Sequence, residues 1–169
     1  MSREISHSTD TLGPACVPHE MTSGPSNLAE SESSVSTDSW ISTEIRVRYA
    51  ETDQMGLVYY ANYLVWFEVG RAEFCRQRGF AYRDFERDND AYLAVAEARC
   101  RYHTPARYDD LLVIRTRVEE FRKRTVRFGY EIVRKDPQTI LATGSTLHVV
   151  LDSQGRPKSF PSAYRGYLQ

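Results

Sequence analysis

Alternating apolar and polar positions predict several strands along this chain. In the segment 44–50, Ile45, Val47 and Tyr49 alternate with charged residues, and this period of two is typical of a half-buried strand. A polar turn follows, and the period then changes. Further extended segments are predicted over residues 92–104, 111–121, 124–135 and 139–151.

Apolar residues at helical spacing predict one long helix over residues 62–78. The residues that share its apolar face are Tyr63, Trp66, Phe67, Gly70 and Phe74. The first half of this helix is apolar on nearly every side, which is typical of a helix enclosed by protein. We expect Asn62 to cap its start and Gly79 to end it. The polar connection after Gly79 has room for one short helical turn.

The order of these elements predicts the fold class. One strand, one long apolar helix and then four consecutive strands favour an antiparallel sheet with the helix on one face, an α+β fold. A five-stranded sheet curled around a single apolar helix is the hotdog arrangement. Because pairing between two copies would hide a free edge strand, we expect at least a homodimer.

Charge and composition divide the chain of 169 residues in two. Residues 1–40 contain ten Ser and carry one basic residue against six acidic ones, a net charge of −5. Residues 41–169 therefore carry +4. The first part has too little apolar surface to offset its ordering entropy, so we predict a disordered tail at 1–40 and one domain at 41–169.

The same properties exclude several classes of protein. A total net charge of −1 gives no footprint for general nucleic-acid binding. The tail lacks the apolar run of a secretory signal, and no stretch reaches the ~18 apolar residues of a membrane span. Cys16, Cys75 and Cys100 are an odd set without metal-like spacing, and we expect reduced thiols in a cytoplasmic protein.

The turn before the long helix is the candidate for chemistry. It places Asp53 between the end of a strand and the start of the helix, where unpaired backbone N–H groups point outward. A carboxylate facing such donors suits acyl transfer, because the donors can hold a carbonyl as it becomes an oxyanion. Asp is also common in turns for local reasons, and Gly56 is expected to permit a positive φ or close packing.

The segment YAETDQMGLVYYANYLVWFEVGR resembles the hotdog acyl-CoA thioesterases of the 4-hydroxybenzoyl-CoA thioesterase type, including the YbgC-like group. The resemblance runs from about residue 44 to about residue 161, so it covers the predicted domain and none of the tail. It implies hydrolysis of an acyl- or aroyl-CoA thioester with no metal or redox cofactor. It also implies a homodimer or homotetramer with the active site at the subunit interface.

The resemblance implies roles for individual residues. Asp53 matches the family's catalytic aspartate, as nucleophile or as general base for water. Tyr60 matches the position whose backbone N–H holds the oxyanion; many YbgC-like members have His there, so any help from a His side chain is absent. Tyr49 matches a tyrosine near the site or is a core aromatic. Tyr59 belongs to the aromatic surroundings of the pocket, and Asn62 orients substrate or caps the helix.

CoA carries phosphates, so a basic patch is expected. Arg122, Lys123 and Arg124 form the densest one; they contact the nucleotide phosphates or form a solvated hairpin tip. Arg156 and Lys158 are weaker candidates.

Other reactive residues are discounted. Glu73 is expected to be an exposed or ion-paired residue of the helix, although another hotdog group uses a helical glutamate. His103 and His148 match no ligand pair, and neither Cys75 nor Cys100 has a partnering His. The alternatives to a thioesterase are a non-catalytic acyl-CoA sensor on the same fold and a hotdog hydratase.

Overall fold

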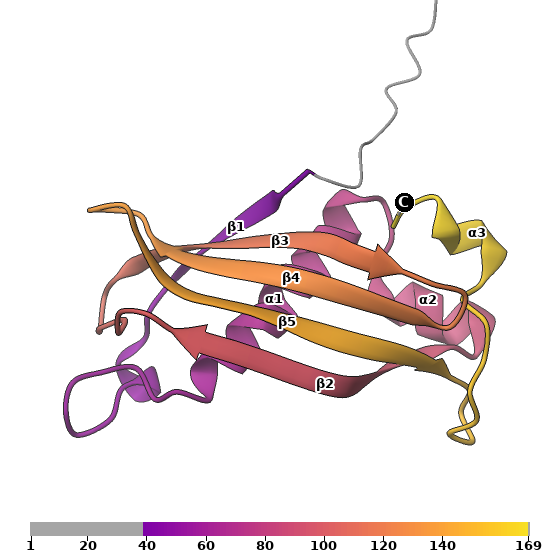
Figure 1. The fold of residues 1–169 in the computed structure, drawn as a ribbon, viewed down its shortest axis with the longest axis horizontal. Helices are drawn as coiled ribbons and strands as arrows, with labels where there is room; N and C mark the ends of the chain where they lie inside the picture. Colours follow the sequence, from indigo (N-terminus) through magenta and orange to yellow (C-terminus); the bar gives the residue numbers. More distant parts are fainter. Residues whose placement is uncertain (1–38, 169) are drawn as a thin grey trace, which may run out of the picture. The chain divides into compact units, whose positions relative to one another are not determined.

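A computed structural model describes residues 39–168 (Figure 1). The elements in chain order are β1 (Ile41–Arg46), the 3₁₀ turn η1 (Tyr49–Glu51), α1 (Asn62–Gln77), α2 (Tyr82–Asn89), β2 (Tyr92–Tyr102), β3 (Leu111–Phe121), β4 (Thr125–Arg134), β5 (Thr139–Leu151) and α3 (Ser162–Arg165). The predicted disorder of the tail and the reduced state of Cys16 concern residues outside the described range. No helix among residues 39–168 is long and apolar enough to cross a membrane.

The five strands form one antiparallel sheet in the order β1-β3-β4-β5-β2. β3, β4 and β5 follow one another as hairpins, while β2 pairs with β5 at one edge and β1 with β3 at the other. α1 lies across one face of this sheet (Figure 1). The predicted α+β hotdog fold is therefore confirmed.

The apolar face of α1 is the one that the sequence predicted. Tyr63, Trp66, Phe67, Gly70 and Phe74 are all buried. Phe67 stacks on a tyrosine of β4 with ring centroids 4.3 Å apart. Gly70 lets the helix approach β3 closely, because a Cβ there would lie 2.5 Å from the hydroxyl oxygen of a buried threonine. Packing at this distance fixes how α1 sits on the sheet.

The first strand and the helix start differ from the predictions. The predicted strand 44–50 is observed as β1, and Tyr49 lies in η1 with 77% of its surface exposed. A period of two does not show where the partner strand begins. β3 starts at Leu111, opposite Arg46. Val47 still bonds to the backbone of Asp109 and Asp110. However, Asp109 has a φ of 67°, which is not strand conformation, and the chain turns into η1 at Tyr49. The predicted cap is also wrong, since the N-cap is Ala61 and Asn62 is the first helical residue.

The outer face of α1 is not enclosed within the described chain. The side chains of Leu64, Val65 and Val69 are 40%, 49% and 39% exposed. The expectation of a helix covered on every side is therefore not met by residues 39–168. Gly79, in contrast, ends the helix as predicted, with a φ of 99°.

A buried polar cluster lies between α1 and the sheet. His148 of β5 is fully buried, and its Nε2 lies 3.0 Å from an Arg71 Nη1 of α1 and 2.8 Å from the Thr146 hydroxyl. Burial, helped by the nearby Arg71 charge, lowers the pKa of His148 to about 4. His148 is therefore neutral near pH 7 and accepts rather than donates toward the guanidinium.

We predict that Gly70→Ala lowers the free energy of unfolding by about 1–3 kcal/mol, as overpacking usually does, despite the better helix propensity of Ala. The new methyl group would meet Thr116 and Ile114, both buried on β3. Urea titration measures the change. Gly166→Ala is the control, because Gly166 is the C-cap of α3 with helical backbone angles and a Cβ there meets nothing within 4 Å. Equal stabilities for the two variants would contradict the close approach.

We predict that the protein loses stability as the pH falls from about 6.5 to about 4. In this window the unfolded chain takes up a proton at His148 that the folded chain refuses, which is worth at most about 3 kcal/mol. Unfolding titrations at several pH values measure the slope, and His148→Gln reduces it. His103→Asn, which changes an exposed histidine, leaves the slope intact. A slope that survives His148→Gln would assign it to other groups.

Candidate functional site

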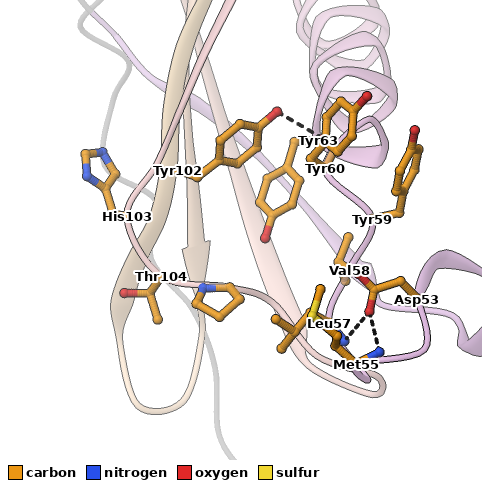
Figure 2. Close-up of a pocket in the computed structure, with 11 residues that line it drawn as sticks. Asp53, Met55, Leu57, Val58, Tyr59, Tyr60, Tyr63, Tyr102, His103 and Thr104 are labelled. Carbon is orange, nitrogen blue, oxygen red and sulfur yellow. Dashed lines mark hydrogen bonds between the residues drawn. The ribbon is translucent and has the colours of Figure 1, made fainter.

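Asp53 lies in a tight turn that its own side chain holds. Its Oδ1 accepts the backbone N–H groups of Met55 at 2.8 Å and Leu57 at 3.3 Å (Figure 2). Its backbone N–H donates to the Leu57 carbonyl at 2.8 Å, and Gly56 completes the turn with a φ of 70°. Space around Gly56 is open, so of the two expected reasons for this glycine the positive φ applies. Within residues 39–168, Oδ2 of Asp53 has no hydrogen-bond partner.

The segment that leads into α1 leaves backbone donors unused. The N–H of Val58 donates to Ala106 at 2.9 Å, and that of Tyr59 donates to Glu51 at 2.9 Å. Among the described residues, the N–H groups of Tyr60 and Ala61 have no acceptor. Since they precede the first turn of a 16-residue helix, they carry the partial positive charge of its N-terminus.

A cavity of about 380 Å³ brings the turn and the helix start together. Its lining residues are Asp53, Met55, Leu57, Val58, Tyr59, Tyr60, Tyr63, Tyr102, His103, Thr104 and Pro105 (Figure 2). The wall is mostly apolar and aromatic, which is typical of a site that takes an organic ligand. Asp53 is the one carboxylate in this lining.

The hydroxyl groups of two lining tyrosines have partners inside the protein. Tyr102 donates to the Tyr60 carbonyl at 3.1 Å, and burial raises the pKa of Tyr102 to about 12. The Tyr63 hydroxyl accepts the Ala106 N–H at 2.9 Å. The two rings meet edge to face with centroids 5.0 Å apart. These contacts fix the wall beside the Tyr60 backbone.

The structure brings some of the predicted site residues together and leaves others apart. Asp53, Tyr59 and Tyr60 line the cavity. Tyr49 does not, since its exposed ring lies edge-on to Tyr108, with centroids 5.7 Å apart. The Asn62 side chain does not line it either; instead of accepting a helix N–H as a cap, it donates to the Glu51 carbonyl at 2.9 Å.

The predicted basic patch lies far from this cavity in one chain. Arg122, Lys123 and Arg124 form the β3–β4 hairpin tip, at the opposite end of the sheet from the Asp53 turn (Figure 1). Arg122 forms an ion pair with Glu120, and the Lys123 carbonyl accepts the Phe160 N–H at 2.8 Å. The single chain therefore does not join the patch to the cavity.

The residues discounted from the sequence lie outside the candidate site, except that His103 lines the cavity. Glu73 is ion-paired with Arg76, as expected of a helical surface glutamate. Burial raises the pKa of Cys75 to about 12, so this thiol is not a nucleophile. His103 does line the cavity, but its Nε2 lies 3.0 Å from the Thr143 hydroxyl and its ring points away from the other lining residues (Figure 2). Within residues 39–168, no group of three or more His, Cys, Asp or Glu could hold a metal ion.

Sequence reasoning missed Glu51. This residue is only 6% exposed and is bonded to both the η1 turn and α1. Its signal in the sequence was an acidic residue between Tyr49 and Asp53, a position that reads equally well as part of a polar turn.

A carboxylate and an unpaired backbone N–H on one apolar cavity can carry out acyl transfer. The N–H can stabilise a carbonyl oxygen as negative charge develops on it, and the carboxylate can attack the carbonyl carbon or activate water. Both interactions become stronger where an apolar wall and a bound ligand exclude water.

Comparisons with known proteins identify the family of this chain. A family model for the thioesterase superfamily matches residues 55–141. YneP of Bacillus subtilis is 38% identical over 130 residues, which cover 73% of this chain and 92% of YneP. The acyl-CoA thioesterase YbgC of Haemophilus influenzae is 31% identical over 126 residues, covering 73% of this chain and 90% of YbgC.

A solved structure shows the same fold. The DHNA-CoA thioesterase of Staphylococcus aureus superposes with a TM-score of 0.71 and 31% identity, over 76% of this chain and 88% of that one. The resemblance stated from the motif around Asp53 is thus confirmed. The chain belongs to the thioesterase superfamily, among the YbgC- and YneP-like hotdog proteins.

Proposed function

We propose that this protein hydrolyses an acyl- or aroyl-CoA thioester to the free acid and CoA. One observation carries the proposal: the Asp53 carboxylate and the unpaired Tyr60 N–H border the same apolar cavity. The relatives named above as acyl-CoA thioesterases support the reaction class.

In the proposed mechanism the thioester carbonyl accepts the Tyr60 N–H at the start of α1. Oδ1 of Asp53 is occupied by two backbone N–H groups, so Oδ2 is the oxygen that acts. It attacks the carbonyl carbon to give a mixed anhydride, which water then cleaves, or it takes a proton from an attacking water. Both routes expel CoA as the thiolate and require no redox cofactor.

The lining favours a flat acyl group. Four tyrosines, Tyr59, Tyr60, Tyr63 and Tyr102, border the cavity, and the hydroxyls of the last two are already bonded within the protein. Aromatic rings pack well against such surfaces, which supports an aromatic acyl group over a long chain.

We further propose a homodimer that completes the site. β2 is an edge strand, and its Val95 is 58% exposed. If two β2 strands pair antiparallel, the start of one lies against the end of the other. The end, Tyr102, borders the cavity, and the start, Tyr92, lies beside the end of β5 and hence near the β3–β4 hairpin. This pairing moves the partner's basic tip toward the cavity, where it can meet the CoA phosphates.

We predict that Asp53→Asn lowers kcat for acyl-CoA hydrolysis by at least about 10³-fold. The Asn side-chain oxygen can still accept the N–H groups of Met55 and Leu57, so the turn survives while the carboxylate is lost. Thiol release from a panel of aromatic and aliphatic acyl-CoA thioesters measures the effect. Asp88→Asn on the surface of α2 is the control and retains full turnover.

Other outcomes of the panel separate the alternatives. Wild-type turnover in Asp53→Asn would remove Asp53 from the mechanism. Tight binding by the unmodified protein without thiol release would indicate an acyl-CoA sensor, and a hydrated acyl-CoA product would indicate a hydratase.

We predict that Val95→Lys weakens the dimer and lowers activity together with it. When Tyr92 of one β2 strand lies opposite Tyr102 of the other, position 95 lies opposite Arg99 of the partner subunit, and like charges at such positions are destabilising. Sedimentation gives the mass of both proteins, and thiol release is measured over the same range of concentrations. An unmodified protein that is monomeric and fully active would contradict the shared site.

A further inference from the structure

Glu51 joins the η1 turn to α1 through its side chain. Its Oε2 accepts the Arg48 N–H at 2.8 Å, and its Oε1 accepts an Arg48 Nη2 at 2.9 Å and the Trp66 Nε1 at 3.3 Å. Burial alone would raise the pKa of Glu51, but the hydrogen bonds from Arg48 and Trp66 outweigh it and hold the pKa below its usual value. The carboxylate is therefore charged and bonded through both oxygens.

The backbone carbonyl of Glu51 holds the approach to α1. It accepts the Tyr59 N–H at 2.9 Å and the Asn62 side-chain amide at 2.9 Å. These two residues lie on either side of Tyr60 and Ala61, whose N–H groups have no acceptor among the described residues. The Glu51 carbonyl thus holds the residues on both sides of the unpaired donors, and we call these two contacts the Glu51 clamp.

Asp53 comes only two residues after this clamp. The peptide between them is short, and Asp53 is tied back to Leu57 in the same strand-like segment that leads to Tyr59. The separation of the Asp53 carboxylate from the Tyr60 N–H therefore depends on where Glu51 is held. Glu51 does not line the cavity, and its carboxylate oxygens are occupied, so it is not itself a reacting group.

We propose that Glu51 is a positioning residue, which sets the distance between the acting carboxylate and the oxyanion donor. The inference rests on the proposed thioesterase function. A charge buried without catalytic need is costly to folding, and its retention beside the site is explained by the geometry that it imposes. Small displacements of reacting groups are costly in rate, and a shift of about 1 Å can cost about 100-fold.

The test compares kcat with KM in Glu51→Gln and Arg48→Met. Glu51→Gln keeps the size of the side chain and one acceptor oxygen but removes the charge. Arg48→Met removes the guanidinium, which is one of the three donors to the Glu51 carboxylate, and leaves the Arg48 backbone N–H in place. Because the Arg48 side chain is exposed, we expect this variant to fold. We expect kcat to fall about tenfold or more in the first and several-fold in the second, with KM within about twofold of the unmodified protein.

Asn62→Ala examines the Glu51 clamp. If Asn62 acts through the Glu51 carbonyl, its loss lowers kcat without raising KM; if it contacts substrate, KM rises instead. Glu131→Gln is the matched control. Glu131 is a half-buried glutamate of β4 that is ion-paired with Arg115 at 3.3 Å, and its change leaves kcat intact whatever it costs in stability.

Several results would overturn the proposal. One is an unchanged kcat in both Glu51→Gln and Arg48→Met, and another is a raised KM with unchanged kcat. The third is a loss of kcat that merely parallels the fall in melting temperature; in that case Glu131→Gln would show a similar loss. If the unmodified protein hydrolyses no acyl-CoA thioester, the result contradicts the proposed function rather than the positioning role. Turnover that Asp53→Asn abolishes and Glu51→Gln spares overturns only the positioning role.

Discussion

The close packing of α1 against the sheet is the constraint on which the rest of the structure depends. Gly70 brings the helix backbone to β3, and Phe67 stacks on Tyr130 of β4. A helix held at these points has no freedom to slide or turn, because protein interiors are packed as densely as crystals. The place of its N-terminus, and with it the unpaired N–H groups of Tyr60 and Ala61, follows from this packing.

The site is assembled around that helix start from segments that are themselves irregular. The Asp53 turn is closed by its own carboxylate, while the hydroxyl of Tyr102 holds the Tyr60 carbonyl from the other side. Irregular backbone adapts easily, so its geometry needs a rigid support. α1 provides that support, and the hydrogen bond from Trp66 of α1 to the buried Glu51 carboxylate links the helix to the η1 turn.

Membership of the thioesterase superfamily suggests a reaction class for this geometry. The chain departs from the family pattern at position 60. Tyr60 stands where many YbgC-like members have His. In the proposed mechanism only the backbone of this residue acts: among the described residues its N–H has no acceptor, and its carbonyl accepts the Tyr102 hydroxyl. The exposed ring of Tyr60 packs beside that of Tyr59, with centroids 4.5 Å apart, and adds to the aromatic wall.

The amino-acid sequence predicted the five strands and the long helix, because side-chain periodicity is a local property; it did not predict the full length of α2 or the short α3. It gave the helix and its buried face, the antiparallel class, the turn at Gly56 and the motif around Asp53. It misjudged Tyr49 and the role of Asn62, since the end of a strand and the partner of an amide depend on segments distant in sequence. Tertiary contacts set Glu51 between Arg48 and Trp66, place the basic hairpin at the far end of the sheet and, within residues 39–168, leave one face of α1 exposed. These features are decided by which segments meet in space, and no local pattern encodes the contacts of a residue with a segment that has not yet folded against it.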